Sequence, residues 1–134
     1  IYGSFFTLMA LISEEMHDCG DLGSVESIWK SVSFINEHFS QKMTLETLSE
    51  MFGYSPSRFS HLFYQVTGTT PMAYLRNVQL ENAREILSYS QISVKEVALY
   101  CGYTDPLYFC KAFKKRYGIS PSEFQKQIEQ MDAD

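Results

Sequence analysis

Apolar side chains recur every three or four positions along most of this chain, which is the spacing of one face of an α-helix. The pattern predicts an amphipathic helix over residues 2–17 and another over 25–39, with a glycine-containing linker between them. No segment alternates between apolar and polar residues for long enough to predict a β-strand. The fold class is therefore expected to be all-α.

The rest of the pattern occurs twice, about fifty residues apart. Residues 43–75 and 92–124 each contain a short helix, a glycine turn, a second helix and a third helix that starts at a proline. Gly53 and Gly102 mark the turn in the two copies, and Thr104 is a one-residue insertion in the second turn. Such a unit has the outline of a helix-turn-helix, whose second helix can lie in the major groove of DNA. Two units in tandem predict a protein that reads two successive grooves.

Both copies contain residues that favour the start of a helix. The prolines that follow Ser55 and Asp105 are typical of a first helical turn and predict helices over 56–67 and 106–117. A third proline-started helix, over 71–88, connects the two copies. At 1.5 Å per residue this connecting helix would be about 27 Å long.

The second helix of each copy has an apolar face and an outer face. Over 56–67 the apolar residues have the i, i+3, i+4, i+7 spacing of a core face, and the opposite face carries Ser57, Ser60, His61 and Tyr64. The equivalent outer positions of the helix over 106–117 are Leu107, Cys110, Lys111 and Lys114. Matching outer positions in both copies are what a reader of two grooves requires.

Side-chain chemistry suggests how these outer residues would bind DNA. Lys111 can donate to guanine, and His61 can hydrogen-bond to base edges. Lys114 and Lys115 are better suited to phosphates. A lysine-rich outer face is more often a solvated surface, but the repeat and the matching phase favour binding here. Cys110 is expected to be a small packing residue rather than a reactive thiol.

The distribution of charge matters more than its total. The formal net charge of −5 is unusual for a protein that binds DNA. Residues 1–24 contribute −4 and residues 129–134 contribute −3, so the segment 25–128 has a net charge of +2. One helix holds four of the basic residues: Lys111, Lys114, Lys115 and Arg116. The acidic total weakens the nucleic-acid interpretation but does not remove it.

Composition argues against several other classes of protein. With 45% hydrophobic and 15% aromatic residues, the chain is expected to fold rather than remain disordered. No apolar run reaches the length of a membrane span, and the three cysteines are expected to be free thiols in a reducing cytoplasm. His17 and Cys19 have no further ligands at zinc spacing, so we expect no metal and no other cofactor. No enzyme motif is present, and we expect no catalytic residue.

One long stretch closely resembles the signature of the AraC/XylS family of transcription regulators. It runs from Ser93 to Phe124, with its glycines and its Asp-Pro and Ser-Pro pairs in register, and the resemblance extends over about residues 28–127. It implies seven helices in two tandem helix-turn-helix subdomains joined by a long connecting helix, here with the N-terminal amphipathic helix in addition. Both recognition helices would then dock in adjacent major grooves on one face of the DNA.

The resemblance also implies which residues contact DNA. The base-reading positions would be Ser57, Ser60, His61, Pro106, Leu107, Cys110 and Lys111. The phosphate-contacting positions would be Tyr64 and Lys114, with Lys115 beside them. Family members often carry arginine at the position of His61 and basic residues at those of Tyr64 and Gln65. We therefore expect the second subdomain to dominate affinity, and the first to add modest specificity or to contact RNA polymerase.

The resemblance further implies a domain organisation. Residues 1–24 would be the last helix of a ligand-sensing domain and a linker, 25–75 the first subdomain, 71–88 the connecting helix and 89–130 the second subdomain. Because the first residue is Ile1 and not Met, the sequence is expected to be cut from a longer chain. The expected role is that of a bacterial transcription activator in the cytoplasm, associated with the nucleoid. Its partners would be a double-stranded DNA operator, RNA polymerase and, through the sensor, a second copy.

A helical protein-interaction module is the main alternative, motivated by the acidic total charge. A steep loss of affinity with salt would distinguish DNA binding from it. An enzyme is the third alternative, and no constellation of residues supports it.

Overall fold

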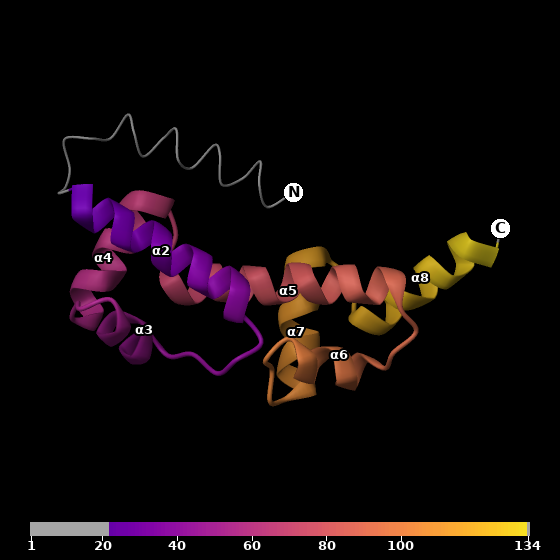
Figure 1. Ribbon diagram of the computed structural model, residues 1–134. Helices are drawn as coiled ribbons and strands as arrows, with labels where there is room; N and C mark the ends of the chain where they lie inside the picture. Colours follow the sequence, from indigo (N-terminus) through magenta and orange to yellow (C-terminus); the bar gives the residue numbers. More distant parts are fainter. Residues whose placement is uncertain (1–21, 134) are drawn as a thin grey trace. The chain divides into compact units, whose positions relative to one another are not determined.

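In the computed structural model, which describes residues 22–133, every regular element is an α-helix (Figure 1). Seven helices follow one another in this part of the chain: α2 Leu22–His38, α3 Leu45–Met51, α4 Pro56–Thr67, α5 Pro71–Tyr89, α6 Val94–Tyr100, α7 Pro106–Tyr117 and α8 Pro121–Ala133. The predicted all-α class is confirmed for these residues. The helix expected over 2–17 lies outside the described residues.

Two details of the first helices differ from the sequence prediction. α2 begins at Leu22, so Gly23 and Ser24, expected in the linker, are helical. Glycine costs a helix only about 1 kcal/mol relative to alanine, and the buried face of a long helix offsets that cost. The i, i+3, i+6 spacing of Leu45, Leu48 and Met51 predicts that all three face inward, but Met51 is 54% exposed, because the short helix α3 buries Leu48 and Ser49 instead.

The chain divides into two compact units, and the first contains the described residues up to Glu37 together with Met43–Leu75. The core of this unit contains fully buried aliphatic residues of α2, together with Phe59 and Phe63 of α4. The Phe59 and Phe63 rings lie 5.8 Å apart, and Phe63 meets Tyr74 edge-on at 5.9 Å. Tilted and edge-on aromatic pairs of this kind add to the free energy of burial. This core fixes which face of α4 remains outside.

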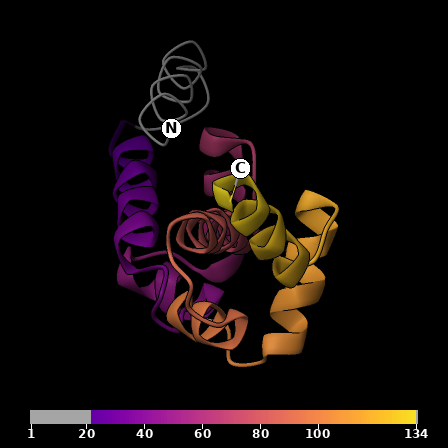
Figure 2. The same cartoon turned by 90° about the vertical axis from the view of Figure 1, so that its right-hand side faces the viewer.

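The second unit contains His38–Lys42 and the chain from Arg76 onward. Its α6, α7 and α8 lie around the C-terminal part of α5 (Figure 2). Phe109 and Phe113 of α7 are fully buried in this core, as is Cys101. Burial raises the pKa of the Cys101 thiol to about 12, so this cysteine is a packing residue and not a nucleophile.

The glycine turns of the two copies are equivalent, as the repeat predicts. Gly53 and Gly102 both have a left-handed backbone, with φ of 80° and 94°. In the first turn, Tyr54 N donates to Ser49 O at 2.9 Å, and in the second, Tyr103 N donates to Ala98 O at 2.9 Å. The same hydrogen bond therefore ends the first helix of each helix-turn-helix.

α5 connects the two helix-turn-helix copies without a break in the helix. Its 19 residues correspond to about 28 Å of helix, close to the length predicted. The residues up to Leu75 belong to the first unit and those from Arg76 to the second. Its apolar side chains from Tyr74 to Leu87 are buried or half-buried, namely Tyr74, Leu75, Val78, Leu80, Ala83, Ile86 and Leu87, and the polar Gln79 is buried as well.

Candidate nucleic-acid interface

The helix α4 is fixed at both ends by local contacts that the sequence encodes. Ser55 is the N-cap, and its hydroxyl accepts from Arg58 N at 3.3 Å. Gly68 ends the helix in a left-handed conformation, and its N–H donates to Tyr64 O at 2.8 Å. Both ends coincide with the predicted range 56–67. Capping of this kind stabilises a helix by about 1 kcal/mol per N-cap and fixes where the helix starts and ends.

The packing of its apolar side in the core leaves the predicted residues of α4 on its outer side. Ser57 and His61 are exposed, Tyr64 is 58% exposed, and Ser60 is half-buried. The opposite side is buried through Phe59, Leu62, Phe63 and Val66. The four outer residues thus form one continuous face along the first two and a half turns of the helix. We call Ser57, Ser60, His61 and Tyr64 the α4 outer face.

α7 repeats this arrangement in the second unit. Asp105 is its N-cap and accepts from Leu107 N at 3.0 Å, while Gly118 closes it at φ 84°. Phe109 and Phe113 anchor the inner side, and Phe113 lies 4.7 Å from the ring of Tyr117. The predicted range 106–117 is again confirmed.

The outer side of α7 is more basic and more apolar than that of α4. Lys111 and Lys114 are exposed, Leu107 is 73% exposed, and Cys110 is half-buried. We call Leu107, Cys110, Lys111 and Lys114 the α7 outer face. Pro106 is half-buried at the start of the helix, and Lys115 is exposed beside the face. The structure therefore places equivalent residues of the two copies on equivalent faces.

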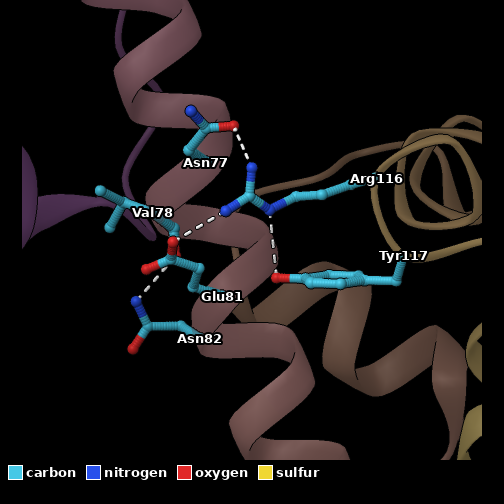
Figure 3. A network of polar contacts seen from close by, with 6 residues as sticks. All are labelled: Asn77, Val78, Glu81, Asn82, Arg116 and Tyr117. Atoms are coloured by element: carbon cyan, nitrogen blue, oxygen red, sulfur yellow. Dashed lines mark hydrogen bonds and ion pairs between the residues drawn. The ribbon is translucent and has the colours of Figure 1, made fainter. Parts of the chain in front are cut away.

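Arg116 differs from the three lysines with which the sequence groups it. Its guanidinium donates to Glu81 Oε1 at 2.9 Å, to Asn77 Oδ1 at 3.1 Å and to the Tyr117 hydroxyl at 3.3 Å (Figure 3). Partial burial lowers its pKa, but the hydrogen bond and charge of Tyr117, together with Glu81, raise the pKa overall. Arg116 thus joins α7 to α5, and its charge is already paired with a carboxylate.

Removing the Arg116 side chain should therefore cost stability. We expect Arg116→Ala to lower the free energy of unfolding by about 1 kcal/mol, since the ion pair is half-exposed and screened by solvent. Lys115→Ala is the matched control, because this neighbour is exposed and should change stability by less than about 0.5 kcal/mol. Urea unfolding followed by circular dichroism measures both. Equal stability of the two variants would contradict a structural role for Arg116.

The sequence matches the family model of a helix-turn-helix domain over residues 48–127, which is more than half of the chain. The chain belongs to the AraC/XylS family of transcription regulators. It is 37% identical over 94 residues to the uncharacterized HTH-type transcriptional regulator YijO of Escherichia coli K12, covering 70% of this chain and 33% of that protein. To the transcriptional activator RhaS of Escherichia fergusonii it is 30% identical over 95 residues, covering 71% of this chain and 34% of that protein.

The fold of this AraC/XylS module is similar to a structure solved with DNA. The DNA-binding domain of the global transcriptional factor AdpA, in complex with a target DNA, is 27% identical and has a TM-score of 0.75. The similarity covers 78% of this chain and 94% of that one. By contrast, the chain spans only about a third of the length of the curated relatives named above.

For Cys110 of the AraC/XylS module, the sequence predicts both a packing role and a position among the base-reading residues. It is half-buried and packs against the core of the second unit, and this burial raises the pKa of its thiol. A raised pKa reduces the thiolate fraction and hence the reactivity. The side chain is therefore a packing residue with one edge on the α7 outer face.

Two exposed cations of this AraC/XylS module were overlooked in the sequence. Arg58 is exposed in the first turn of α4, next to Ser57, and adds a positive charge beside an outer face that holds no lysine or arginine. Arg76 is exposed on α5 and lines a cavity with Lys111. The position of Arg58 follows from helical spacing, but the approach of Arg76 to α7 depends on tertiary packing that no spacing reveals.

Within residues 22–133 no three acidic, histidine or cysteine side chains gather where they could hold a metal ion. In the same part of the chain, no helix has the length and apolar character required to span a bilayer. His17 and Cys19 lie outside the described residues.

Proposed function

We propose that this chain is the DNA-binding module of a transcription regulator that reads a specific operator through two adjacent major grooves. The observation that carries this proposal is the repetition of one capped, amphipathic helix in two copies, each with an exposed outer face at equivalent positions. An α-helix fits the width of a B-form major groove, where base edges can be distinguished. Membership of a family of DNA-binding regulators supports it, and no enzymatic role is proposed.

The outer faces would divide the contacts with DNA between bases and phosphates. On α4, Ser57, Ser60 and His61 would contact base edges through hydrogen bonds, and Tyr64 would contact a phosphate. On α7, Pro106 and Leu107 would lie against bases at the helix start, with Lys111 donating to guanine. Cys110 would add a small apolar contact, and Lys114 and Lys115 would hold phosphates.

The second unit would supply most of the affinity. Its outer face and flank hold three exposed lysines, whereas the α4 outer face holds none. Contacts with phosphates account for a large share of the affinity for DNA. The first unit would add modest specificity or contact RNA polymerase. RhaS, a relative by sequence, is an activator, and we propose that this chain also acts as an activator.

The whole regulator would have a second part that controls the module. Residues 1–24 would be the end of a ligand-sensing domain and a linker, followed by the first subdomain over 25–75, the connecting helix over 71–88 and the second subdomain over 89–130. The coverage of only about a third of the relatives' length supports this organisation. Such a regulator would act in the cytoplasm at the nucleoid, and the sensor would pair two copies.

The experiment that tests DNA binding is a titration of the chain with a fluorescent random-sequence duplex of about two turns. We expect binding at low salt that weakens at physiological salt by about 0.9 log units per log unit of salt for each phosphate contact. Lys114→Ala should reduce that slope, and Lys95→Ala, which removes an exposed lysine of α6, should not. A chain fused to a strong dimeriser that still binds no duplex would contradict the proposal.

A protein-interaction module remains the second candidate because the chain carries a net charge of −5. On that account, duplex affinity would be negligible at every salt concentration, including for the dimerised chain. The same titration therefore decides between the two functions.

A further inference from the structure

A basic cavity lies between α5 and α7 in the second unit. Its volume is about 530 Å³, and its lining residues are Arg76, Asn77 and Leu80 of α5 with Tyr108, Lys111, Ala112, Lys115 and Arg116 of α7. Four of these eight residues are cationic, and none is acidic. A concave surface lined by one sign of charge raises the local concentration of ions of the opposite sign. The cavity therefore favours an anion.

One wall of the cavity is held rigid by the network around Arg116. Glu81 neutralises this guanidinium at 2.9 Å, so Arg116 contributes shape and position more than free charge. Asn77 accepts from Arg116 through Oδ1, which leaves its side-chain NH₂ group as a donor (Figure 3). A donor held by a fixed neighbour loses little entropy when it binds a ligand.

Within the described residues, the other three cations of the cavity lack a carboxylate partner such as Arg116 has in Glu81. Arg76, Lys111 and Lys115 are exposed, and within residues 22–133 none of them forms an ion pair or a side-chain hydrogen bond. The lining of the cavity thus supplies one guanidinium, two ammonium groups and the Asn77 amide, and such donors match the several oxygens of a phosphate. A phosphate is therefore the anion that suits this cavity best.

The position of the cavity beside the α7 outer face indicates the source of the phosphate. Lys111 belongs to both the α7 outer face and the cavity, whereas Tyr108 and Lys115 lie further round the helix toward α5. An α-helix is about 10–12 Å wide with its side chains, and the major groove is about 12 Å wide. The flank of a helix inserted in that groove must therefore face one of the two bordering strands.

We propose that this cavity binds a backbone phosphate of the DNA strand that borders the groove read by α7, with Arg76 and Lys115 as its main ligands. The inference rests on the proposed function and deepens it by adding a residue of the connecting helix to the DNA contacts. Such a contact carries no sequence information, but it fixes the rotation of α7 in the groove. α5 then takes part in binding and is more than a spacer.

The test compares Arg76→Gln and Lys115→Gln with Lys95→Gln, a control at an exposed lysine of α6 that does not line the cavity. Each cavity variant should lose affinity by the same factor for a selected operator and for a random duplex. The slope of log affinity against log salt should fall by about 0.9 for each lost contact. Lys95→Gln should behave as the wild type, and thermal unfolding should show that all three variants fold.

A scan of the bordering strand with neutral methylphosphonates locates the contact. One substituted position should weaken binding of the wild type but cause no further loss in the Arg76→Gln/Lys115→Gln double variant. If the wild type binds DNA and both cavity variants keep its affinity and salt slope, the inference is wrong.

A wild type that binds no duplex even when fused to a strong dimeriser would contradict the proposed function, and the cavity would then have to be tested by itself. A titration of the chain with inorganic pyrophosphate, monitored through the amide chemical shifts, then shows whether the cavity binds a phosphate. Shifts at the cavity that disappear in the double variant would support a phosphate site that takes a free phosphate rather than DNA. No shifts would overturn the inference.

Discussion

Gly102→Ala is expected to destabilise the second unit by about 3 kcal/mol, whereas Gly53→Ala should cost the first unit only about 1–2 kcal/mol. Both glycines have positive φ, so each alanine would incur the steric cost of a left-handed conformation, about 1–2 kcal/mol. A Cβ on Gly53 would meet nothing within 4 Å. One on Gly102 would lie 2.9 Å from Gln79 Nε2 and 3.0 Å from Phe39 O.

The additional cost at position 102 comes from a buried hydrogen bond. Gln79 Nε2 donates to Phe39 O at 3.1 Å, and the Gln79 side chain is almost completely buried. Moving the amide away from a new Cβ would leave a buried polar group without its partner, at a cost of about 1–3 kcal/mol. Gly102→Val, with a larger branched side chain, should prevent the second unit from folding and abolish DNA binding.

The two glycine variants can be compared by urea unfolding with two signals. Trp29 in α2 is the only tryptophan, so its fluorescence reports on the first unit, while circular dichroism reports on all helices. We expect Gly102→Ala to lower the urea midpoint of the transition seen by circular dichroism more than Gly53→Ala does. Equal destabilisation by both variants would mean that the crowding at Gly102 is unimportant.

Lys111→Ala is expected to weaken operator binding more than any other single change on the two outer faces, by about 10-fold or more. A lysine that donates to a guanine edge contributes about 1–3 kcal/mol of discrimination, and Lys111 is also part of the basic cavity. His61, at the equivalent position of α4, should matter less, because the α4 outer face holds no lysine, whereas the α7 outer face and its flank hold three. We expect His61→Ala to cost less than about 1 kcal/mol.

Fluorescence anisotropy with a selected operator measures this ranking, and Lys95→Ala again serves as the control for lost charge. Lys111→Ala should also reduce the ratio of operator to random-duplex affinity, which a phosphate contact would leave unchanged. If His61→Ala weakened operator binding more than Lys111→Ala, the first unit and not the second would dominate affinity.

The sequence predicted the helices of the two outer faces best, because their ends are specified locally. An N-cap residue, a proline in the first turn and a C-terminal glycine gave both bounds of α4 and α7. The start of α2 was wrong by three residues, because Gly23 was read as part of a linker although burial of the α2 face stabilises helix there. Local signals are thus reliable where several coincide and weak where a single glycine stands alone.

What the sequence could not reveal depends on contacts between distant residues. Arg116 was grouped with the lysines of its own helix, although its partners Asn77 and Glu81 lie on α5. The crowding of Gly102 by Gln79 and by residues after α2, and the approach of Arg76 to α7, are likewise set by packing. Helical spacing gives the face on which a residue lies, but not the neighbour that the face will meet.

The central claim is that α4 and α7 each read a major groove, and methylation interference tests it most directly. A selected operator is methylated sparsely at guanine N7, which lies in the major groove, and bound duplexes are separated from free ones. We predict two windows of interference, their centres about one helical turn or 10 base pairs apart, with Lys111→Ala weakening interference in one window only. A single window, or no interference from methylation at guanine N7, would contradict the account.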